Sequence, residues 1–443
     1  MSAGTISWPL DLAKQVEAAL ADKGQSIPLQ ALRTLFETMF FASLRTEEGS
    51  PIMFHVVYID PERPDPHRPQ RVTDDRWAVV PFSEHLPFTL PTLRKLATAT
   101  DPRSSSIAVY HGPDEEVYIW GFVDQGNRYF DFITHDAHSG PDRPGVFQAS
   151  ILGVGKIAAY MGYALVADLD VNQLHGPAID ALGGGPVVDA LRPGLDLFIR
   201  GVRNVVGEDI YKERDHWELS LGFSWLTVLR RLLLRAQQYR HGGAILITPD
   251  ETHAELNIKH RLAYDRLRSA LHRNGVTTMR STHARDRIHN DYLDKRADSL
   301  PAHLYLTETI AGSERDDSQS EINGAIWFVS LLSRVDGLVL LTPHLEVGGF
   351  GVEITSKAPP ARIAIATSPT ATEGGRIDLD YNYFGTRHRS MMRYCAKHPG
   401  SVGFVISQDG DVRVMTLVGD TVVVWENVML RLDDMDSVRK SDD

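Results

Sequence analysis

Apolar residues recur at two different spacings in the first half of this 443-residue chain. Residues 10–46 repeat them every three or four positions, which predicts helices. Ile52–Ile59, Trp77–Phe82 and Ser106–Val123 are rich in β-branched and aromatic residues and predict strands. Gly112–Glu116 is typical of a turn, so the last stretch predicts a hairpin.

The chain that follows carries weaker signals. Arg128–Thr134 predicts one more strand, and His135–Pro144 has the composition of a loop. From there to about Asp170 we expect a helical or mixed region. Helix and strand breakers gather in Ala181–Gly194, and we place a domain boundary soon after them.

The second half alternates helices with short apolar strands. Helices are expected over about His216–Arg240, Ala263–Gly275 and Glu321–Val335, and from about Thr386; glycines should end the first two. Strands are expected at Ala244–Thr248, as a strand–turn–strand over Asp336–Ile354, and at Val402–Ser407, Asp411–Leu417 and Thr421–Trp425. This alternation indicates α/β layering.

Length and composition divide the chain further. A chain of this length predicts two or three domains. We expect an α+β domain over 1–210, an α/β domain over 211–430 and a disordered tail over 431–443.

Charge and cysteine content exclude several classes of protein. The net charge of −12 argues against a nucleic-acid partner. Cys395 is the single cysteine, so no disulfide forms within the chain, and a cytoplasmic location is expected. The N-terminus lacks the basic start and apolar run of a secretory signal. The most apolar stretch, Leu221–Leu234, contains Arg230 and Arg231 and is too short for a membrane span.

One basic triplet stands out in this acidic chain. Arg387, His388 and Arg389 follow Gly385 and Thr386 at an expected helix start, with Thr386 as a good N-cap. Cations in a first turn oppose the helix dipole, and a bound phosphate would compensate them. His388 could donate to that phosphate or ligate a metal. A solvated surface cluster is the alternative reading.

Two further pairs suggest the same chemistry, each with an equally simple structural explanation. Asp336-Gly337 lies where a helix meets a buried strand, so Asp336 could hold a divalent ion beside a phosphate, or be a plain turn residue. Ser407-Gln408 closes the strand after the basic helix, or belongs to a hairpin turn before Asp409-Gly410.

Together these residues resemble the diadenylate cyclase domain, over about His216–Val424. Gly385-Thr386-Arg387-His388-Arg389 matches the family's Gly-Thr-Arg-His-Arg signature residue for residue. Asp336-Gly337-Leu338 resembles its Asp-Gly-Ala motif, and Val405–Gln408 is similar to the Val-Ser-Gln motif of the family's DNA-integrity-scanning branch. Arg235–Thr248 resembles the helix and Gly-Ala strand that open the domain. The resemblance implies a mixed sheet flanked by helices, preceded here by a sensor-like α+β domain.

The resemblance also implies an activity. Two ATP molecules, held with Mn²⁺ or Mg²⁺ by two domains facing each other in a homo-oligomer, would become cyclic di-AMP and two pyrophosphates. An unidentified small molecule or protein would act on the N-terminal domain. By this resemblance, Asp336 would align the 3′-hydroxyl or bind the metal, and His388 would bind the metal or contact a phosphate. The other phosphate contacts would come from Gly385, Thr386, Arg387 and Arg389, with Ser407 and Gln408 at the β- and γ-phosphates. The nucleotide and its adenine would be bordered by Gly337, Leu338 and Ile354.

Three departures from the family keep a second hypothesis open. Leu338 replaces Ala, Ala358–Asp380 resembles an insertion, and Tyr381–Phe384 replaces an acidic or polar lead-in. The alternative is a nucleotide-binding sensor that uses the same phosphate site with little or no turnover. A DNA-scanning role is disfavoured by the acidic charge.

Other motifs carry less chemistry. Leu152–Ala158 suggests a phosphate loop, but Ser150 stands where Gly is required and Ile157 where Ser or Thr is required. A metal site at His135–His138 is weaker than the interpretation as polar surface. Gly183–Pro186 is typical of a hinge or turn, and His216–Trp225 of a packed core face.

Overall fold

The chain divides into two compact units. The computed structural model describes residues 6–64, 78–101, 104–125, 146–161, 164–212, 216–239, 241–295, 299–408 and 411–430. Unit 1 is Met1–Ala178 with Arg431–Asp443, and unit 2 is Ile179–Leu430. The division thus lies some thirty residues before the expected boundary at 210, because helix α5 (Pro186–Val206) packs against the helices and sheet of unit 2.

Unit 1 is an α+β unit built on one sheet, as expected. Eight strands of its described residues follow the spatial order β10-β9-β8-β7-β3-β5-β6-β4. Helices α1, α2 and α3 share one core with one face of this sheet. The bounds are α1 Pro9–Asp22, α2 Leu29–Ser43, β1 Thr46–Glu47, β2 Ser50–Pro51, β3 His55–Tyr58, β4 Ala78–Pro87, α3 Leu90–Ala97, β5 Ser105–His111, β6 Val117–Asp124, β7 Phe147–Gly153, β8 Lys156–Met161, β9 Ala164–Asp170 and β10 Gln173–His175.

The structure confirms part of the expected pattern in unit 1. Strands β5 and β6 form the antiparallel hairpin predicted over Ser106–Val123. The helical or mixed region expected up to Asp170 is wrong, because β7, β8 and β9 form an antiparallel meander there. Arg128–Thr134 and the loop His135–Pro144, with its candidate metal residues, lie outside the described residues.

The phosphate-loop hypothesis for Leu152–Ala158 is wrong on structural grounds. The segment is the end of β7, a turn and the start of β8, with no helix whose N-terminus could face a phosphate. The Lys156 ammonium forms an ion pair with Asp170 at 2.8 Å across the β8–β9 pair.

Unit 2 is built on a mixed sheet. Nine strands of its described residues follow the order β12-β14-β13-β11-β17-β18-β19-β15-β16. The α/β class is therefore confirmed. The strands are β11 Gly243–Ile247, β12 Leu256–Tyr264, β13 Leu338–Leu341, β14 Val347–Ile354, β15 Arg362–Ala366, β16 Arg376–Asp378, β17 Val402–Ile406, β18 Val412–Val418 and β19 Thr421–Trp425.

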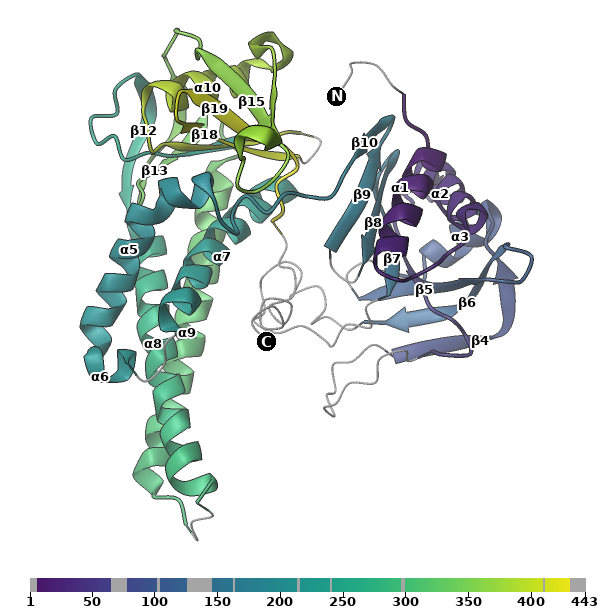
Figure 1. The fold of residues 1–443 in the computed structure, drawn as a ribbon. Coiled ribbons are helices and arrows are strands. Elements are labelled where there is room, and N and C mark those ends of the chain that lie inside the picture. The colour runs from purple at the N-terminus through teal and green to yellow at the C-terminus, as the bar shows by residue number, and fades with distance from the viewer. Residues whose placement is uncertain are drawn as a thin grey trace. The chain divides into compact units, whose positions relative to one another are not determined.

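Period-two alternation divides the strands between two cores. Ala244 and Leu246 of β11 pack with Met391 of helix α10 (Thr386–Lys397), which covers one face of the sheet. Ile245 and Ile247 pack on the other face with α5, α7 (Trp217–Gln238) and α9 (Ala302–Leu332) (Figure 1). The core-face interpretation of His216–Trp225 is confirmed by the burial of its tryptophans in this second core.

A long helical hairpin projects from the sheet of unit 2 (Figure 1). It consists of α8 (Arg266–Ile288) and α9 (Ala302–Leu332). The helix end expected at Gly275 is wrong: Gly275 lies inside α8, where a Cβ would come 2.9 Å from Val202 Cγ2 of α5. Glycine here serves close helix packing rather than a stop.

The segment Ala358–Asp380, which resembles an insertion, adds two strands to the sheet of unit 2. It contains β15, which pairs in parallel with β19, and β16, which pairs antiparallel with β15. Gly183–Pro186 leads directly into α5, whose N-cap is Gly185. Across the described part of the chain, no helix combines the length and the apolar character that crossing a membrane requires.

Candidate functional site

The residues expected to act together lie at one end of the unit 2 sheet. Strands β11 and β13 are parallel neighbours, and Ile245 pairs with Val339. Strand β17 is antiparallel to β11, and Gly243 pairs with Ile406. Three segments therefore lie side by side at the same end of these strands. They are the chain entering β11, the Asp336-Gly337 pair entering β13 and the Ser407-Gln408 pair leaving β17.

Gly242 is the point where two of these segments meet the basic helix. Its φ of +67° suits glycine, and it ends the approach from α7 as the sequence predicts. A Cβ on Gly242 would lie 2.9 Å from Arg387 Nη1 and 3.2 Å from Gln408 Cγ. The structure thus brings Arg387 and Gln408 together over the start of β11.

Asp336 lies on the strand beside this point. Extending the β11–β13 register by three residues from the Ile245–Val339 pair sets Gly242 level with Asp336. Neighbouring strands lie about 4.8 Å apart, so Asp336 and the Arg387–Gln408 contact lie near each other at this end of the sheet. The Asp336 side chain is exposed, as a residue that meets a ligand must be.

Gly337 is required by the close approach of two neighbouring backbones. Its φ is +112°, and a Cβ would lie 2.6 Å from the carbonyl carbon of Gly351 in β14. Gly351 itself has a φ of +62°. The glycine of the Asp-Gly pair therefore allows the chain at the start of β13 to approach β14 closely, which is a backbone reason for this motif.

Helix α10 begins at Thr386, as expected, but its N-cap differs from the expected one. Gly385, and not Thr386, is the N-cap, and Thr386 is the first helical residue. The Gly385 position has a φ of −67° and open space around its Cα. No side chain among the described residues caps this end, so its first N–H groups are available to an anion.

His388 is a neutral ring held by an arginine from the sheet. Arg413 Nη1 of β18 lies 3.3 Å from His388 Nε2, and Arg413 Nε donates to Glu426 Oε1 at 2.9 Å. Burial, followed by the charges of Arg413 and Arg387, lowers the pKa of His388 from 6.5 to about 4. Because a guanidinium can only donate, His388 Nε2 accepts and its proton lies on Nδ1.

This contact bears on the expected metal role of His388. A ring nitrogen needs a free lone pair to ligate a metal, and the Nε2 lone pair already accepts from Arg413. The Nδ1–H group remains as a neutral donor. Of the two candidate metal ligands, Asp336 alone presents an exposed oxygen with no hydrogen bond in the described residues.

Arg389 points to an aromatic partner. Its guanidinium carbon lies 5.8 Å from the centre of the Tyr381 ring, and that of Arg393 lies 5.6 Å from the same ring. Both are within cation–π range. Arg389 Nε is buried and has no hydrogen-bond partner. In the segment Tyr381–Phe384, where the family has acidic or polar residues, the ring of Tyr381 is thus the partner of the Arg389 guanidinium.

Ser407 takes part in the hairpin turn as well as lying at the site. Its Oγ accepts the backbone N–H of Asp411 at 3.0 Å, and its own N–H donates to the Asp411 carbonyl. The turn interpretation is therefore correct for Ser407, whose hydroxyl proton is still free to donate. Gln408 is exposed beside Gly242.

The side chain of Leu338, which stands where the diadenylate cyclase motif has Ala, packs in the core of unit 2. Leu338 is 5% exposed and packs beneath α10, on the side opposite Val339. Ile354, the last residue of β14, is half-buried at the edge of the same core. Leu338 therefore fills protein interior, and Ile354 is the one of the two that reaches the surface.

Sequence reasoning missed one charged group near Asp336. Lys259 of β12 forms an ion pair with Glu353 at 2.6 Å, and Asn257 donates to Glu353 at 3.2 Å. Glu353 raises the pKa of Lys259, and Asp336 adds to that rise. Strand β12 was not expected, although its Leu256, Ile258 and Leu262 are spaced like strand residues, and this alternation was the signal available.

The donors suit a cation that arrives with phosphate rather than a resident metal. Within the described residues, no group of three or more His, Cys, Asp or Glu side chains could hold a metal ion. Mg²⁺ is commonly bound by one or two carboxylates together with substrate phosphates and water. Asp336 fits that pattern only in the presence of a triphosphate.

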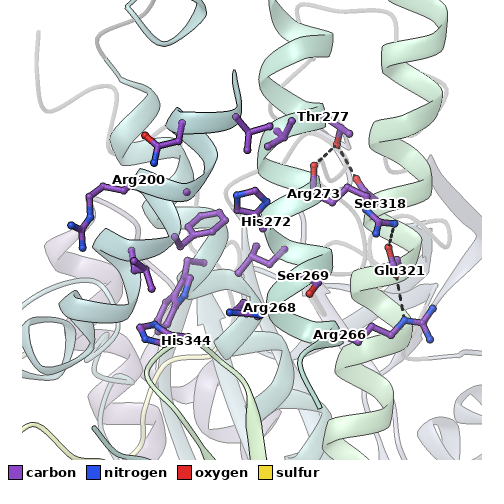
Figure 2. A pocket seen from close by; sticks show the side chains of 18 of the residues that line it. Arg200, Arg266, Arg268, Ser269, His272, Arg273, Thr277, Ser318, Glu321 and His344 are labelled. Carbon is purple, nitrogen blue, oxygen red and sulfur yellow. Dashed lines mark hydrogen bonds and ion pairs between the residues drawn. The ribbon is translucent and has the colours of Figure 1, made fainter. Parts of the chain in front are cut away.

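A large cavity of unit 2 lies at the other end of the sheet. Its volume is about 1310 Å³, and it is lined by α5, α8, α9 and His344 of the β13–β14 turn (Figure 2). Arg266 and Arg273 both pair with Glu321 there, at 3.4 and 2.7 Å. The Glu321 carboxylate is thus shared by two arginines, and the cavity is separate from the Asp336–Arg387 site.

Comparisons with known proteins bear on unit 1. Residues 23–124 match the model of a family described as the probable sensor domain DACNV. This match covers α2 through β6 and agrees with the expected N-terminal sensor domain. No curated protein and no solved structure matches the chain.

Proposed function

We propose that this chain is a diadenylate cyclase, which condenses two ATP molecules into cyclic di-AMP and is regulated through unit 1. The observation that carries the proposal is the convergence of Asp336, Arg387 and Gln408 at one edge of the sheet, beside the uncapped N-terminus of α10. The match of unit 1 to DACNV supports it, because that name is associated with diadenylate cyclases.

The residues of the site divide the work of phosphoryl transfer. Arg387 and the first N–H groups of α10 bind phosphate oxygens, and His388 adds a neutral Nδ1–H donor. Gln408 and the Ser407 hydroxyl lie where the outer phosphates would extend along the edge. Asp336 orients the ribose 3′-hydroxyl and accepts its proton. A divalent cation bound with the triphosphate supplies charge neutralisation.

The reaction needs two sites to face each other. Each 3′-oxygen forms a bond to the α-phosphorus of the other ATP, and the bond from that phosphorus to the β-phosphate oxygen breaks. Two pyrophosphates leave, and each hydroxyl proton passes to a carboxylate or water. Positioning and electrostatic stabilisation supply most of such catalysis. Because two copies must meet, specific activity should fall on dilution.

The decisive experiment is mass spectrometry of the products after incubation with ATP and Mn²⁺ or Mg²⁺. Wild type should form cyclic di-AMP, and Asp336→Asn should form none while its circular dichroism is unchanged. Asp378→Asn is the matched control, because Asp378 is a 76% exposed carboxylate on the edge strand β16. Equal product from wild type and Asp336→Asn, or no product from wild type across metals and protein concentrations, would remove the proposal.

One observation favours a second candidate function. Arg389 is stacked on Tyr381, so part of the expected phosphate grip is already engaged. A nucleotide sensor with the same site would bind ATP without turnover. It predicts calorimetric ATP binding that Arg387→Gln weakens about tenfold or more, with no product. Arg362→Gln, an exposed arginine on β15, is the control.

A further inference from the structure

The α8–α9 hairpin carries arginines at a spacing of one heptad. Arg266, Arg273, Arg280 and Arg287 follow one another every seven residues along α8. Residues seven apart lie almost above one another on a helix, so these side chains form one ladder about 32 Å long. Three of the four line the large cavity, and the last lines a smaller one of about 320 Å³ that continues along the hairpin.

The opposite wall of the same groove is acidic. Glu314, Asp317 and Glu321 of α9 line the large cavity, and Glu314 also lines the smaller one. Overall α8 contains six arginines and one aspartate, whereas α9 contains five acidic residues and one arginine. One face of the hairpin therefore presents a positive and a negative stripe side by side.

Compensation within the arginine ladder stops halfway along the hairpin, although Arg285 of α8 and Glu308 of α9 still form an ion pair farther out, at 3.8 Å. At the sheet end, Glu321 pairs with both Arg266 and Arg273 (Figure 2). Farther out, Arg280 and Arg287 form no ion pair within the described part of the chain, and neither does Glu314. All three are exposed, so this stretch holds unmatched charges of both signs.

The unmatched stretch is bordered by apolar side chains that unit 2 leaves in water. Leu306 is 56% exposed and Ile310 is 58% exposed. Their spacing places them on the face of α9 that carries Glu314. The distal turns of the hairpin project beyond α5 and α6 (Glu208–Tyr211) of the same unit (Figure 1). Exposed apolar groups gathered with uncompensated charges mark an interaction surface.

We propose that this face of the hairpin is a docking surface for a second copy of the chain. A two-fold axis along the hairpin sets α8 of one copy opposite α9 of the other at the same height. Arg280 then meets Glu314 of the second copy twice, once on each side of the axis, and the Leu306–Ile310 stripes are covered. Two stripes of opposite sign make the face complementary to itself, whereas an acidic or a basic partner would satisfy one stripe only.

The test is a charge exchange in the full-length protein. Wild type should self-associate in sedimentation velocity at micromolar concentrations. Arg280→Glu alone and Glu314→Arg alone should each weaken this association about tenfold or more, because each replaces two attractions by two repulsions. An equimolar mixture of the two variants should associate as wild type does. Arg362→Glu, on β15, is the control with the same charge change and no expected effect.

Three results would overturn the inference. Wild type could remain monomeric at about 100 µM, the single variants could associate as wild type does, or the mixture could fail to recover association. If a single charge variant changed the frictional ratio but not the sedimenting mass, the face would form a contact within one chain, and the proposed contact between copies would be wrong. Ile310→Glu is an independent test that leaves Arg280 unchanged, and it should also weaken association. None of these outcomes depends on turnover at the Asp336 site, so the two proposals can fail separately.

Discussion

Neutral His388 makes the stability of unit 2 depend on pH in a defined window. Burial, followed by the charges of Arg413 and Arg387, lowers its pKa from 6.5 to about 4. The unfolded chain binds the proton near pH 6.5, whereas the folded chain binds it only near pH 4. Between these values unfolding takes up a proton, so the free energy of unfolding decreases as the pH falls. Above pH 6.5 the full contribution is present.

The size of the effect follows from the shift. One pKa unit corresponds to about 1.4 kcal/mol, so the displacement from 6.5 to about 4 corresponds to about 3.5 kcal/mol at most. At pH 4.5 most of this contribution has been lost, so the free energy of unfolding is about 2 to 3 kcal/mol lower than at neutral pH. This is a large fraction of the stability of an ordinary domain.

The assay compares wild type with His388→Gln in urea at pH 7.5 and pH 4.5. Other groups titrate in both proteins and cancel, so wild type should lose about 2 to 3 kcal/mol more than the variant between the two values. Arg413→Gln should raise the His388 pKa and shift the midpoint of the loss upward. Equal losses in wild type and His388→Gln would refute the interpretation of His388 as a buried neutral ring.

Three further outcomes follow from the packing. Gly337→Ala should destabilise unit 2 by about 3 kcal/mol or more, because its Cβ would meet the Gly351 backbone at a φ of +112°; Gly385→Ala, with open space at its Cα, should cost under about 1 kcal/mol by thermal denaturation. Cys395 is fully buried with its pKa raised to about 12, so mass spectrometry should find no iodoacetamide adduct in the native protein at pH 8 and full modification in guanidinium. Gly194→Ala, whose Cβ would lie under 2 Å from the Pro343 carbonyl oxygen, should destabilise unit 2 by about 3 kcal/mol or more in thermal denaturation.

The fold of unit 2 was predictable where a pattern is local. The strand–turn–strand over Asp336–Ile354 and the strands of Val402–Trp425 show strong apolar runs with turn residues between them, and the structure has them. The helix stop at Gly275 failed, because glycine is used there to let α8 approach Val202. A contact of this kind depends on a helix some seventy residues away, which no local pattern can show.

The neighbourhood of the candidate site was predictable in part. The grouping of Asp336 with Gln408 needs only the strand order, because both lie at the same end of neighbouring strands, whereas the place of Arg387 depends on how α10 packs. The partner of His388 could not be predicted, because Arg413 reaches it through the inward face of β18 beneath α10. The alternation of Arg413 and Met415 in β18 does place both on the α10 side, and it was the available signal.

The balance of charge around the start of α10 gives a physical reason for a ligand there. Three guanidinium groups surround this helix end, and two are compensated: Arg413 by Glu426, and Arg389 by the Tyr381 ring. Arg387 forms no ion pair within the described residues, and it lies on a helix end that is itself electropositive. A folded protein keeps such a conflict when function requires it. The uncompensated charge therefore lies at Arg387, beside Gly242 and level with Asp336, which is where the phosphates of the proposed substrate would bind.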